Sequence, residues 1–302
     1  MATSHKVDFK YSGLYDKPTF QKAFNDTFAK SASFNAAAIP DLFALVGLIG
    51  KDKDINDVRW AAYMLATVMW ETTSPTAVSQ VARNKKGVPL KDKKGQLIVV
   101  VQRKWLMTMA PVEEVGHGKG RRYHEPVKVK SLADCSVQVT EQDGDQFRMS
   151  AAGVVTALTK GAAMGTTDGG TLVKRYVEDD GAELAFYGRG YVQLTWWSNY
   201  ASSGIVIGKG LDLLLDPDLV KQPEVAYRLM SHGMRTGKGF ANGHKLSDYF
   251  DAKKTDYVSA RRMVNGTDHA KDIAAIAVKF EGVLRKASKA ATVPAAAAAA
   301  LP

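Results

Sequence analysis

Residues 186–201, FYGRGYVQLTWWSNYA, combine glycines, an arginine, amide side chains and several aromatic rings in one short segment. A strand of a hydrophobic core does not need glycine on both sides of an arginine. A surface loop does not need the adjacent aromatic pair Trp196 and Trp197. Gly188 and Gly190 allow a close approach of the backbone to another group. The segment therefore predicts one wall of a binding site, with the residues that act on the bound molecule supplied from elsewhere.

The composition of the chain is that of an ordinary globular protein. It has 302 residues, of which 45% are hydrophobic and 24% are charged, so one large domain or two small domains are expected. The 41 basic and 31 acidic residues give a net charge of +10. Such an excess either favours a polyanionic partner (nucleic acid, an anionic membrane or a phosphate-bearing cell wall) or serves solubility alone. No recognition-helix or aromatic-sheet motif accompanies the charge, so we do not expect a nucleic-acid partner.

The cysteine content and the apolar runs bear on where the protein folds. Cys135 is the single cysteine, so no internal disulfide is expected. The first residues, MATSHKVDFKYSG, have no apolar core of a secretory signal, and no apolar run approaches the ~20 residues that a membrane span needs. We therefore expect a protein that is made in a cytoplasm and has no membrane span.

Hydrophobic spacing predicts helices towards both ends of the chain and strands in the middle. Apolar residues recur with helical spacing in residues 17–31, 54–73, 222–237 and 268–288, and residues 36–50 form a further apolar stretch. Between them, β-branched runs and glycine-punctuated charged segments predict strands, hairpins and loops. The interpretation is a single α+β domain over residues 1–290 with an insertion at about 80–180. Residues 291–302 are an alanine-rich tail.

Glu71 ends one of the predicted helices, on or beside its apolar face and next to Trp70. A carboxyl group in apolar surroundings loses hydration, and its pKa rises. A raised pKa keeps a general acid protonated near neutral pH. The alternative is a glutamate that simply lies in solvent at a helix end.

Cleavage of a glycosidic bond needs a second carboxylate on the other side of the bond. The candidates downstream are Glu113, Glu114, Glu125, Glu178 and Glu183. The first two belong to a glycine-rich basic segment that lacks the Gly-x-x-x-x-Gly-Lys-Ser/Thr spacing of a phosphate loop, so nucleotide binding is rejected. His117 and His124 do not have a convincing metal spacing, and we expect neither a metal nor a cofactor.

Four blocks of the sequence resemble family 19 glycoside hydrolases, which include chitinases and related phage and bacterial peptidoglycan-cleaving enzymes. They are AAYMLATVMWETT (61–73), YGRGYVQLTWWSNYASSG (187–204), LLLDPDLVKQPEVAYRLM (213–230) and ARRMVNGTDHAKDIAAIAVKFE (260–281). The resemblance implies a mainly helical, lysozyme-like fold with a cleft. It also implies inverting hydrolysis of β-1,4 links between N-acetylated sugars.

The resemblance also assigns catalytic roles. Glu71 falls on the general acid of the family. Position 80, where short-loop relatives carry the general base, is Gln80. If most of residues 74–109 is an insertion, the base becomes Glu113, with Glu114 as the alternative. Thr195 corresponds to the Ser/Thr that helps to hold the attacking water.

The same resemblance predicts the residues that bind sugar. Gln193, Asn199 and Asn265 match amides near the cleft of the family. Tyr187 and the pair Trp196 and Trp197 offer faces for stacking on sugar rings, with one tryptophan of the pair expected in the core. Arg189 either contacts the substrate or fixes its loop through a carboxylate.

Three features depart from the family. Trp70 replaces a common histidine, the disulfides of the plant enzymes are absent, and the region at 80–180 is longer than expected. The leading hypothesis is a phage endolysin or virion-associated lysin that cleaves the glycan strands of bacterial peptidoglycan. It would act as a monomer, held in the host cytoplasm until a holin-type pore opens to the periplasm. The alternatives are a chitinase and a catalytically dead, glycan-binding virion protein.

Overall fold

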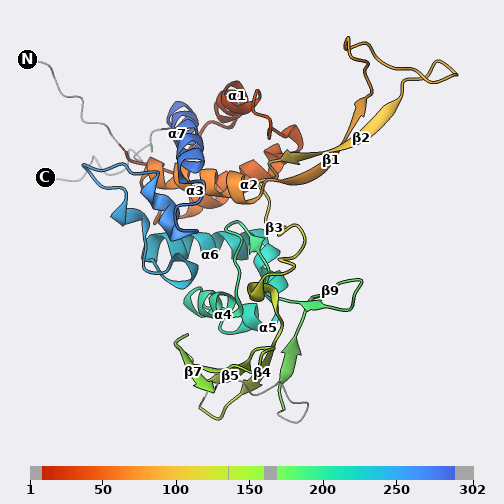
Figure 1. Cartoon of the computed structure of the whole chain (residues 1–302). Helices are drawn as coiled ribbons and strands as arrows, with labels where there is room; N and C mark the ends of the chain where they lie inside the picture. The colour runs from red at the N-terminus through yellow and green to blue at the C-terminus, as the bar shows by residue number, and fades with distance from the viewer. Residues whose placement is uncertain (1–8, 135, 160–168, 290–302) are drawn as a thin grey trace, which may run out of the picture.

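The computed structural model describes residues 9–134, 136–159 and 169–289. The single cysteine, Cys135, and the predicted tail at 291–302 lie outside these residues. A helical body occupies the upper part of Figure 1, a long two-stranded arm projects from it, and a small sheet lies at the opposite end.

The N-terminal helices and the last helix form one packed unit. They are α1 (Lys17–Phe28), α2 (Ile39–Lys51), α3 (Val58–Glu71) and α7 (Ala270–Ala287). The side chains of Asp16 and Asp57 cap α1 and α3 by accepting backbone N–H groups. Phe280 of α7 packs against Phe24 and Phe28 of α1, with ring centroids 5.9 and 4.9 Å apart. These contacts confirm the apolar stripes predicted for both helices.

Helix α3 lies at the centre of the body and carries Glu71 at its end. Eleven of its residues are buried, from Val58 to Met69. A helix that is apolar on nearly every side must be enclosed by other elements, and α2 and α7 both pack against α3. The enclosure fixes the position of the last helical turn, in which the candidate acid lies.

The C-terminal half adds α4 (Trp197–Val206), α5 (Asp212–Leu215) and α6 (Pro223–Thr236). Gly237 ends α6 with a φ of 74°, at the end of the helix predicted for residues 222–237. Helix α4 was not predicted, because its short apolar run follows directly on the glycine-rich segment. Short 3₁₀ turns complete this half at Ala36–Ala38, Arg122–His124, Pro217–Lys221, Gly239–Ala241, Leu246–Asp248 and Ser259–Met263.

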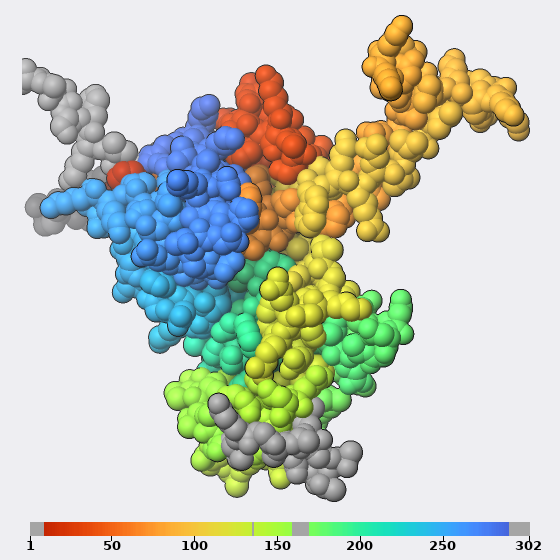
Figure 2. Space-filling model, viewed as in Figure 1, coloured from red at the N-terminus to blue at the C-terminus, as the bar shows by residue number. Residues whose placement is uncertain are grey.

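Strands β1 (Ser74–Val81) and β2 (Val99–Leu106) form an antiparallel hairpin directly after α3. Their register pairs Ser74 with Leu106 and Val81 with Val99. This hairpin, here called the arm (Ser74–Leu106), extends away from the body in Figures 1 and 2. The hairpin predicted for this region is confirmed.

A five-stranded antiparallel sheet in the order β7-β6-β5-β4-β8 lies beside α4. Phe147 of this sheet packs against Trp197, with ring centroids 5.6 Å apart. A two-stranded pair, β9 (Tyr176–Val177) with β10 (Glu183–Leu184), follows the sheet along the chain. The strands of the sheet are β4 (Val127–Ser131), β5 (Val137–Thr140), β6 (Gln146–Met149), β7 (Val155–Thr159) and β8 (Thr171–Val173).

One pair of two-residue strands has the greatest consequence for the site. Strand β3 (Val112–Glu113) pairs with β11 (Arg189–Gly190), with Glu113 opposite Arg189. This pairing brings the segment with the two candidate bases against the glycine-rich segment 186–201.

The α+β class predicted from the sequence is confirmed. The strands found in the described residues lie between Ser74 and Gly190, with helices on both sides in sequence. Among the described residues, no helix combines the length and the apolar character needed to cross a membrane. The lysozyme-like arrangement implied by the family resemblance stays a prediction.

Candidate active site

A cleft of about 570 Å³ lies between the end of α3 and the β3–β11 pair. It brings together seven of the residues that the sequence singled out, from segments far apart in the chain. They are Glu71, Glu113, Glu114, Gln193, Thr195, Trp196 and Asn265.

Glu71 lies in the last turn of α3 with its side chain 14% exposed. Burial raises the pKa of its carboxyl group above the ordinary value, and the positive charge of Arg261 opposes this rise. Arg261 donates a hydrogen bond from Nη1 to Oε1 of Glu71. The C-terminal end of a helix also disfavours negative charge, which acts in the same direction as burial. The carboxyl group thus has the environment of a proton donor.

The turn after Glu71 is fastened to the returning end of the arm. The buried Thr72 hydroxyl donates to the carbonyl of Val68 at 2.7 Å and accepts the backbone N–H of Met109 at 3.2 Å. The hydroxyl of Thr108 donates to the carbonyl of Thr72 at 3.0 Å. The polar residues 72–74 therefore hold the segment that leads to β3 against the end of α3, beside the candidate acid.

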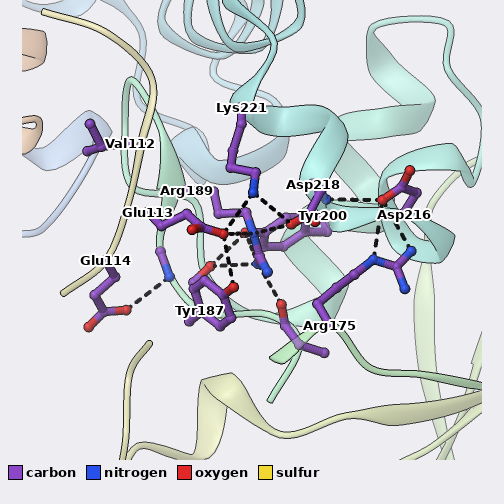
Figure 3. A network of polar contacts seen from close by, with 12 residues as sticks. Val112, Glu113, Glu114, Arg175, Tyr187, Arg189, Tyr200, Asp216, Asp218 and Lys221 are labelled. Carbon is purple, nitrogen blue, oxygen red and sulfur yellow. Dashed lines mark hydrogen bonds and ion pairs between the residues drawn. The ribbon is translucent and has the colours of Figure 1, made fainter. Parts of the chain in front are cut away.

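Glu113 belongs to a network of charges (Figure 3). Its carboxylate accepts hydrogen bonds from Nζ of Lys221 at 2.9 Å and from the hydroxyl of Tyr187 at 3.0 Å, and Nε of Arg189 lies 3.8 Å away. Burial alone would raise the pKa of Glu113, but the hydrogen bonds from Lys221 and Tyr187 and the nearby cations hold it below its ordinary value. A carboxylate stabilised in this way is a weak base.

Glu114 points away from that network (Figure 3). Its Oε1 accepts the hydroxyl of Tyr123 at 2.5 Å, and its Oε2 accepts the backbone N–H of Gly188 at 2.9 Å. Within the part of the chain that the structure describes, no Lys or Arg nitrogen lies within 4.0 Å of this carboxylate. Its negative charge is held in place by two neutral donors, whereas Lys221 and Arg189 lie beside the carboxylate of Glu113.

Gly188 is required by the close packing of these groups. A Cβ atom at this position would lie 2.8 Å from Oε1 of Gln193 and 3.2 Å from both Cβ and Oε2 of Glu114. Gln193 in turn donates from Nε2 to the carbonyls of Val112 and Gly190 at 3.1 and 3.2 Å. The glycine before Arg189 thus allows Glu114 and Gln193 to approach the same backbone segment.

Thr195 and Asn265 line the cleft together with the carboxylates. The backbone carbonyl of Thr195 accepts the side-chain amide of Asn199 at 3.0 Å. No other described residue forms a hydrogen bond with the hydroxyl of Thr195. That hydroxyl is therefore available to a water molecule or to a substrate.

The two tryptophans of the quoted segment have different roles. Trp196 is 41% exposed, lines the cleft and has a positive φ of 69°. Trp197 is buried and donates from Nε1 to Glu141 at 2.6 Å. The expectation that one of the pair belongs to the core is thus met by Trp197. A positive φ in a bulky residue is strained, and such strain concentrates at functional sites.

Three residues predicted to bind substrate do not line the cleft. Arg189 is fully buried and donates from Nε to Asp218 at 3.0 Å, so the alternative role, fixing its loop through a carboxylate, is the one observed. Tyr187 is 2% exposed, and the Arg189 guanidinium lies 3.6 Å from its ring centroid. Asn199 is used within its own turn, in the bond to Thr195. Their contribution is to position the cleft wall.

Four residues of the site were not predicted from the sequence. Arg261 pairs with Glu71, 190 residues earlier, and Lys221 pairs with Glu113, 108 residues earlier. No local sequence pattern predicts partners at such separations. Tyr123 and Trp105 line the cleft. An aromatic residue at the end of a charged strand was the only available signal for Trp105.

Outside the cleft, three carboxylates gather in the turn between β5 and β6. Glu141, Asp143 and Asp145 each offer an oxygen atom, and these atoms lie within 4.8 Å of one another. Arg122 pairs with Asp143 at 2.5 Å, and Trp197 donates to Glu141. These partners account for two of the three groups without an ion.

Comparison with known proteins supports a chitinase-like relationship. The chain is 42% identical over 71 residues to the acidic endochitinase pcht28 of Solanum chilense, and the matched segment covers 23% of this chain and 27% of that protein. Over 62 residues, it is 42% identical to the acidic 26 kDa endochitinase of Solanum lycopersicum, covering 20% and 23%. The matches thus span about a quarter of the length of these curated relatives. No protein-family model matches the chain.

Proposed function

We propose that this protein is a glycoside hydrolase that cleaves β-1,4 links between N-acetylated sugars by an inverting mechanism. The observation that carries the proposal is the arrangement of the cleft. Glu71, with its raised pKa, lines the cleft, and so do Glu113, the last residue of β3, and Glu114, which follows it. Inversion requires a protonated acid and an ionised base on opposite faces of the sugar.

In this mechanism, Glu71 delivers its proton to the oxygen of the leaving sugar. Arg261 keeps the carboxyl group oriented, and it stabilises the carboxylate that remains after proton transfer. Burial keeps the proton on Glu71 until the bond breaks, and the ion pair limits how far the pKa rises.

Glu114 is the better general base, although the sequence placed Glu113 first. The base must accept a proton from water, and the two cations and the tyrosine hydroxyl around Glu113 reduce its tendency to do so. Glu114 accepts only from Tyr123 and a backbone N–H, and it lines the cleft. In this account the hydroxyl of Thr195 helps to hold the attacking water.

As substrate we propose the glycan strands of bacterial peptidoglycan, with the protein acting as a monomeric phage endolysin or virion-associated lysin. The positive net charge of +10 supports an anionic wall as the target. The route that fits this proposal is storage in the host cytoplasm and release to the periplasm through a holin-type pore. A single cysteine means that folding does not depend on an internal disulfide.

Chitin is the second candidate substrate, because the two plant relatives are named endochitinases. Both polymers offer β-1,4-linked N-acetylated sugars. Mass spectrometry of the products from purified peptidoglycan, with chitin oligomers in parallel, separates the two. We expect peptidoglycan fragments with new reducing ends, and the sugar at that end distinguishes a muramidase from a glucosaminidase. Products from chitin alone would reject the peptidoglycan proposal, and no products from either polymer would reject the hydrolase.

A further inference from the structure

The tip of the arm, residues 82–98, does not line the cleft. It projects from the body as the orange and yellow segment of Figure 2 and ends in two loops (Figure 1). Each loop repeats one pattern, Asn or Asp followed by Lys-Lys-Gly, at residues 84–87 and 92–95. Asn84 Oδ1 accepts two backbone N–H groups at 2.9 and 3.0 Å, and Asp92 Oδ1 accepts two at 2.8 and 2.9 Å.

A ring of backbone hydrogen bonds holds the two loops together. The N–H of Ala82 donates to the carbonyl of Ile98 at 2.8 Å, that of Ile98 donates to Leu90 at 3.0 Å, and that of Leu90 donates to Ala82 at 2.7 Å. The two Lys-Lys pairs are therefore carried on one ordered tip and do not belong to independent loops.

The arm holds most of the excess charge of the protein. Residues 74–106 contain eight basic residues and one acidic residue, Asp92, which gives seven of the ten net positive charges. Among the described residues, no carboxylate lies within 4.0 Å of any of these eight basic side chains. The carboxylate of Asp92 is already bonded to its own turn. The tip thus presents cations without counter-charges.

Exposed aliphatic side chains lie beside these cations. Six of them, between 37% and 67% exposed, are Val88, Leu90, Leu97, Ile98, Val99 and Val101. Val99 and Val101 are two residues apart on β2, so they share one face of the arm. Contiguous exposed apolar residues mark an interaction surface. Residues 76–104 contain no aromatic ring, and aromatic rings are what sugar and base recognition use.

We propose that the tip of the arm docks on an anionic lipid bilayer. The lysines of the two loops at residues 84–87 and 92–95 contact the lipid phosphates, and the aliphatic residues enter the boundary between headgroups and acyl chains. Lysine next to aliphatic side chains, without aromatic rings, favours this surface over an anionic polysaccharide or nucleic acid. Docking would hold the cleft near a membrane, whatever bond the cleft cleaves.

Sedimentation of the full chain with vesicles tests the proposal. The probe is a vesicle of phosphatidylcholine and phosphatidylglycerol, compared with phosphatidylcholine alone, in about 0.1 M salt. We expect binding to the anionic vesicles only. Substitution of Lys85, Lys86, Lys93 and Lys94 by Gln should weaken it by roughly tenfold or more. The charge-matched control replaces Lys30, Lys53, Lys271 and Lys286, which are exposed on the body, and should bind as the unmodified protein does.

A second variant, Val99→Ser with Val101→Ser, tests the apolar contribution. We expect this variant to bind vesicles more weakly than the unmodified protein, and the difference should remain in about 0.5 M salt, where charge attraction is largely screened. Circular dichroism should show unchanged folding for both arm variants, because the altered side chains are exposed. Equal loss in the tip and body lysine variants would overturn the proposal. So would absence of vesicle binding, or binding to a soluble anionic polysaccharide in its place.

Discussion

Arg261 lies in the 3₁₀ segment Ser259–Met263 and reaches the carboxylate of Glu71 at the end of α3. The guanidinium is 2% exposed and the glutamate side chain 14% exposed, so the pair is shielded from water. Two opposed influences therefore set the proton affinity of the candidate acid. Burial raises its pKa, and Arg261 lowers it.

Removal of the Arg261 charge should move the pH dependence of hydrolysis. The acid must be protonated, so activity falls as the pH rises through the pKa of Glu71. Arg261→Met removes the main influence that opposes burial, so the pKa of Glu71 should rise further and the basic limb of the kcat profile should move to higher pH. Arg261→Lys keeps a positive charge and should move the basic limb less. An unchanged basic limb in a folded Met variant would contradict the assignment of Glu71.

Glu114→Gln should mainly lower kcat, whereas Glu113→Gln should mainly lower stability. Loss of a general base lowers kcat by about 10²–10⁴-fold, and we expect that loss for Glu114→Gln. Glu113→Gln should retain more activity and lose stability, because Lys221 and Arg189 lose a charged partner. Steady-state kinetics and thermal unfolding of both variants decide the matter. A dead Glu113→Gln beside an active Glu114→Gln would restore the order that the sequence suggested.

The stability effect of Glu113→Gln should depend on pH. The pKa of Glu113 is lower in the folded protein than its ordinary value of about 4.3, so the carboxylate stabilises the fold above that pH. This contribution is lost as the pH falls through the folded pKa. The difference in unfolding free energy between the variant and the unmodified protein should therefore be largest near pH 7 and shrink below about pH 4. A difference that is constant from pH 7 to pH 3 would show that charge is not its cause.

Gly188→Ala should displace the proposed base while leaving its carboxylate chemically unchanged. The added methyl group would meet Gln193 at 2.8 Å and Glu114 at 3.2 Å, so one of them must move. We expect a clear fall in kcat and a loss of about 1–3 kcal/mol in unfolding free energy. Gly47→Ala is the matched control, because it lies in α2 with nothing within 4 Å of the added Cβ. It should be neutral or stabilise by up to about 1 kcal/mol. Full activity in Gly188→Ala would mean that the packing does not position the base.

The exposed aromatic residues of the cleft should act on substrate binding. Trp105→Ala and Trp196→Ala should each raise KM by roughly tenfold, because each removes an exposed ring that lines the cleft. Trp197→Ala is the contrasting variant, since that ring is buried and its loss should cost about 3–5 kcal/mol of stability. Unchanged KM values in both cleft variants would place the sugar elsewhere.

The local parts of the fold could be predicted from the sequence. The stripes of α1 and α7, the cap at Asp57 and the end at Gly237 depend on neighbours within a few residues. The partners of Glu71 and Glu113 could not be predicted, because Arg261 and Lys221 are brought close by tertiary packing alone. Arg189 shows the same limit, since the sequence alone does not distinguish a carboxylate partner from a bound sugar. The sequence alone also could not decide between Glu113 and Glu114 as the base. The β3–β11 register directs their side chains to different partners, and a shift of one residue in that register would exchange their positions.

The most direct measurement is the release of new reducing ends from purified peptidoglycan by the unmodified protein and by Glu71→Gln. The glutamine keeps the shape of the side chain and removes the transferable proton. We predict hydrolysis by the unmodified protein and a rate about 10²–10⁴-fold lower for the variant, at unchanged folding by circular dichroism. Equal rates for the two proteins would contradict the central claim that Glu71 is the proton donor of this cleft.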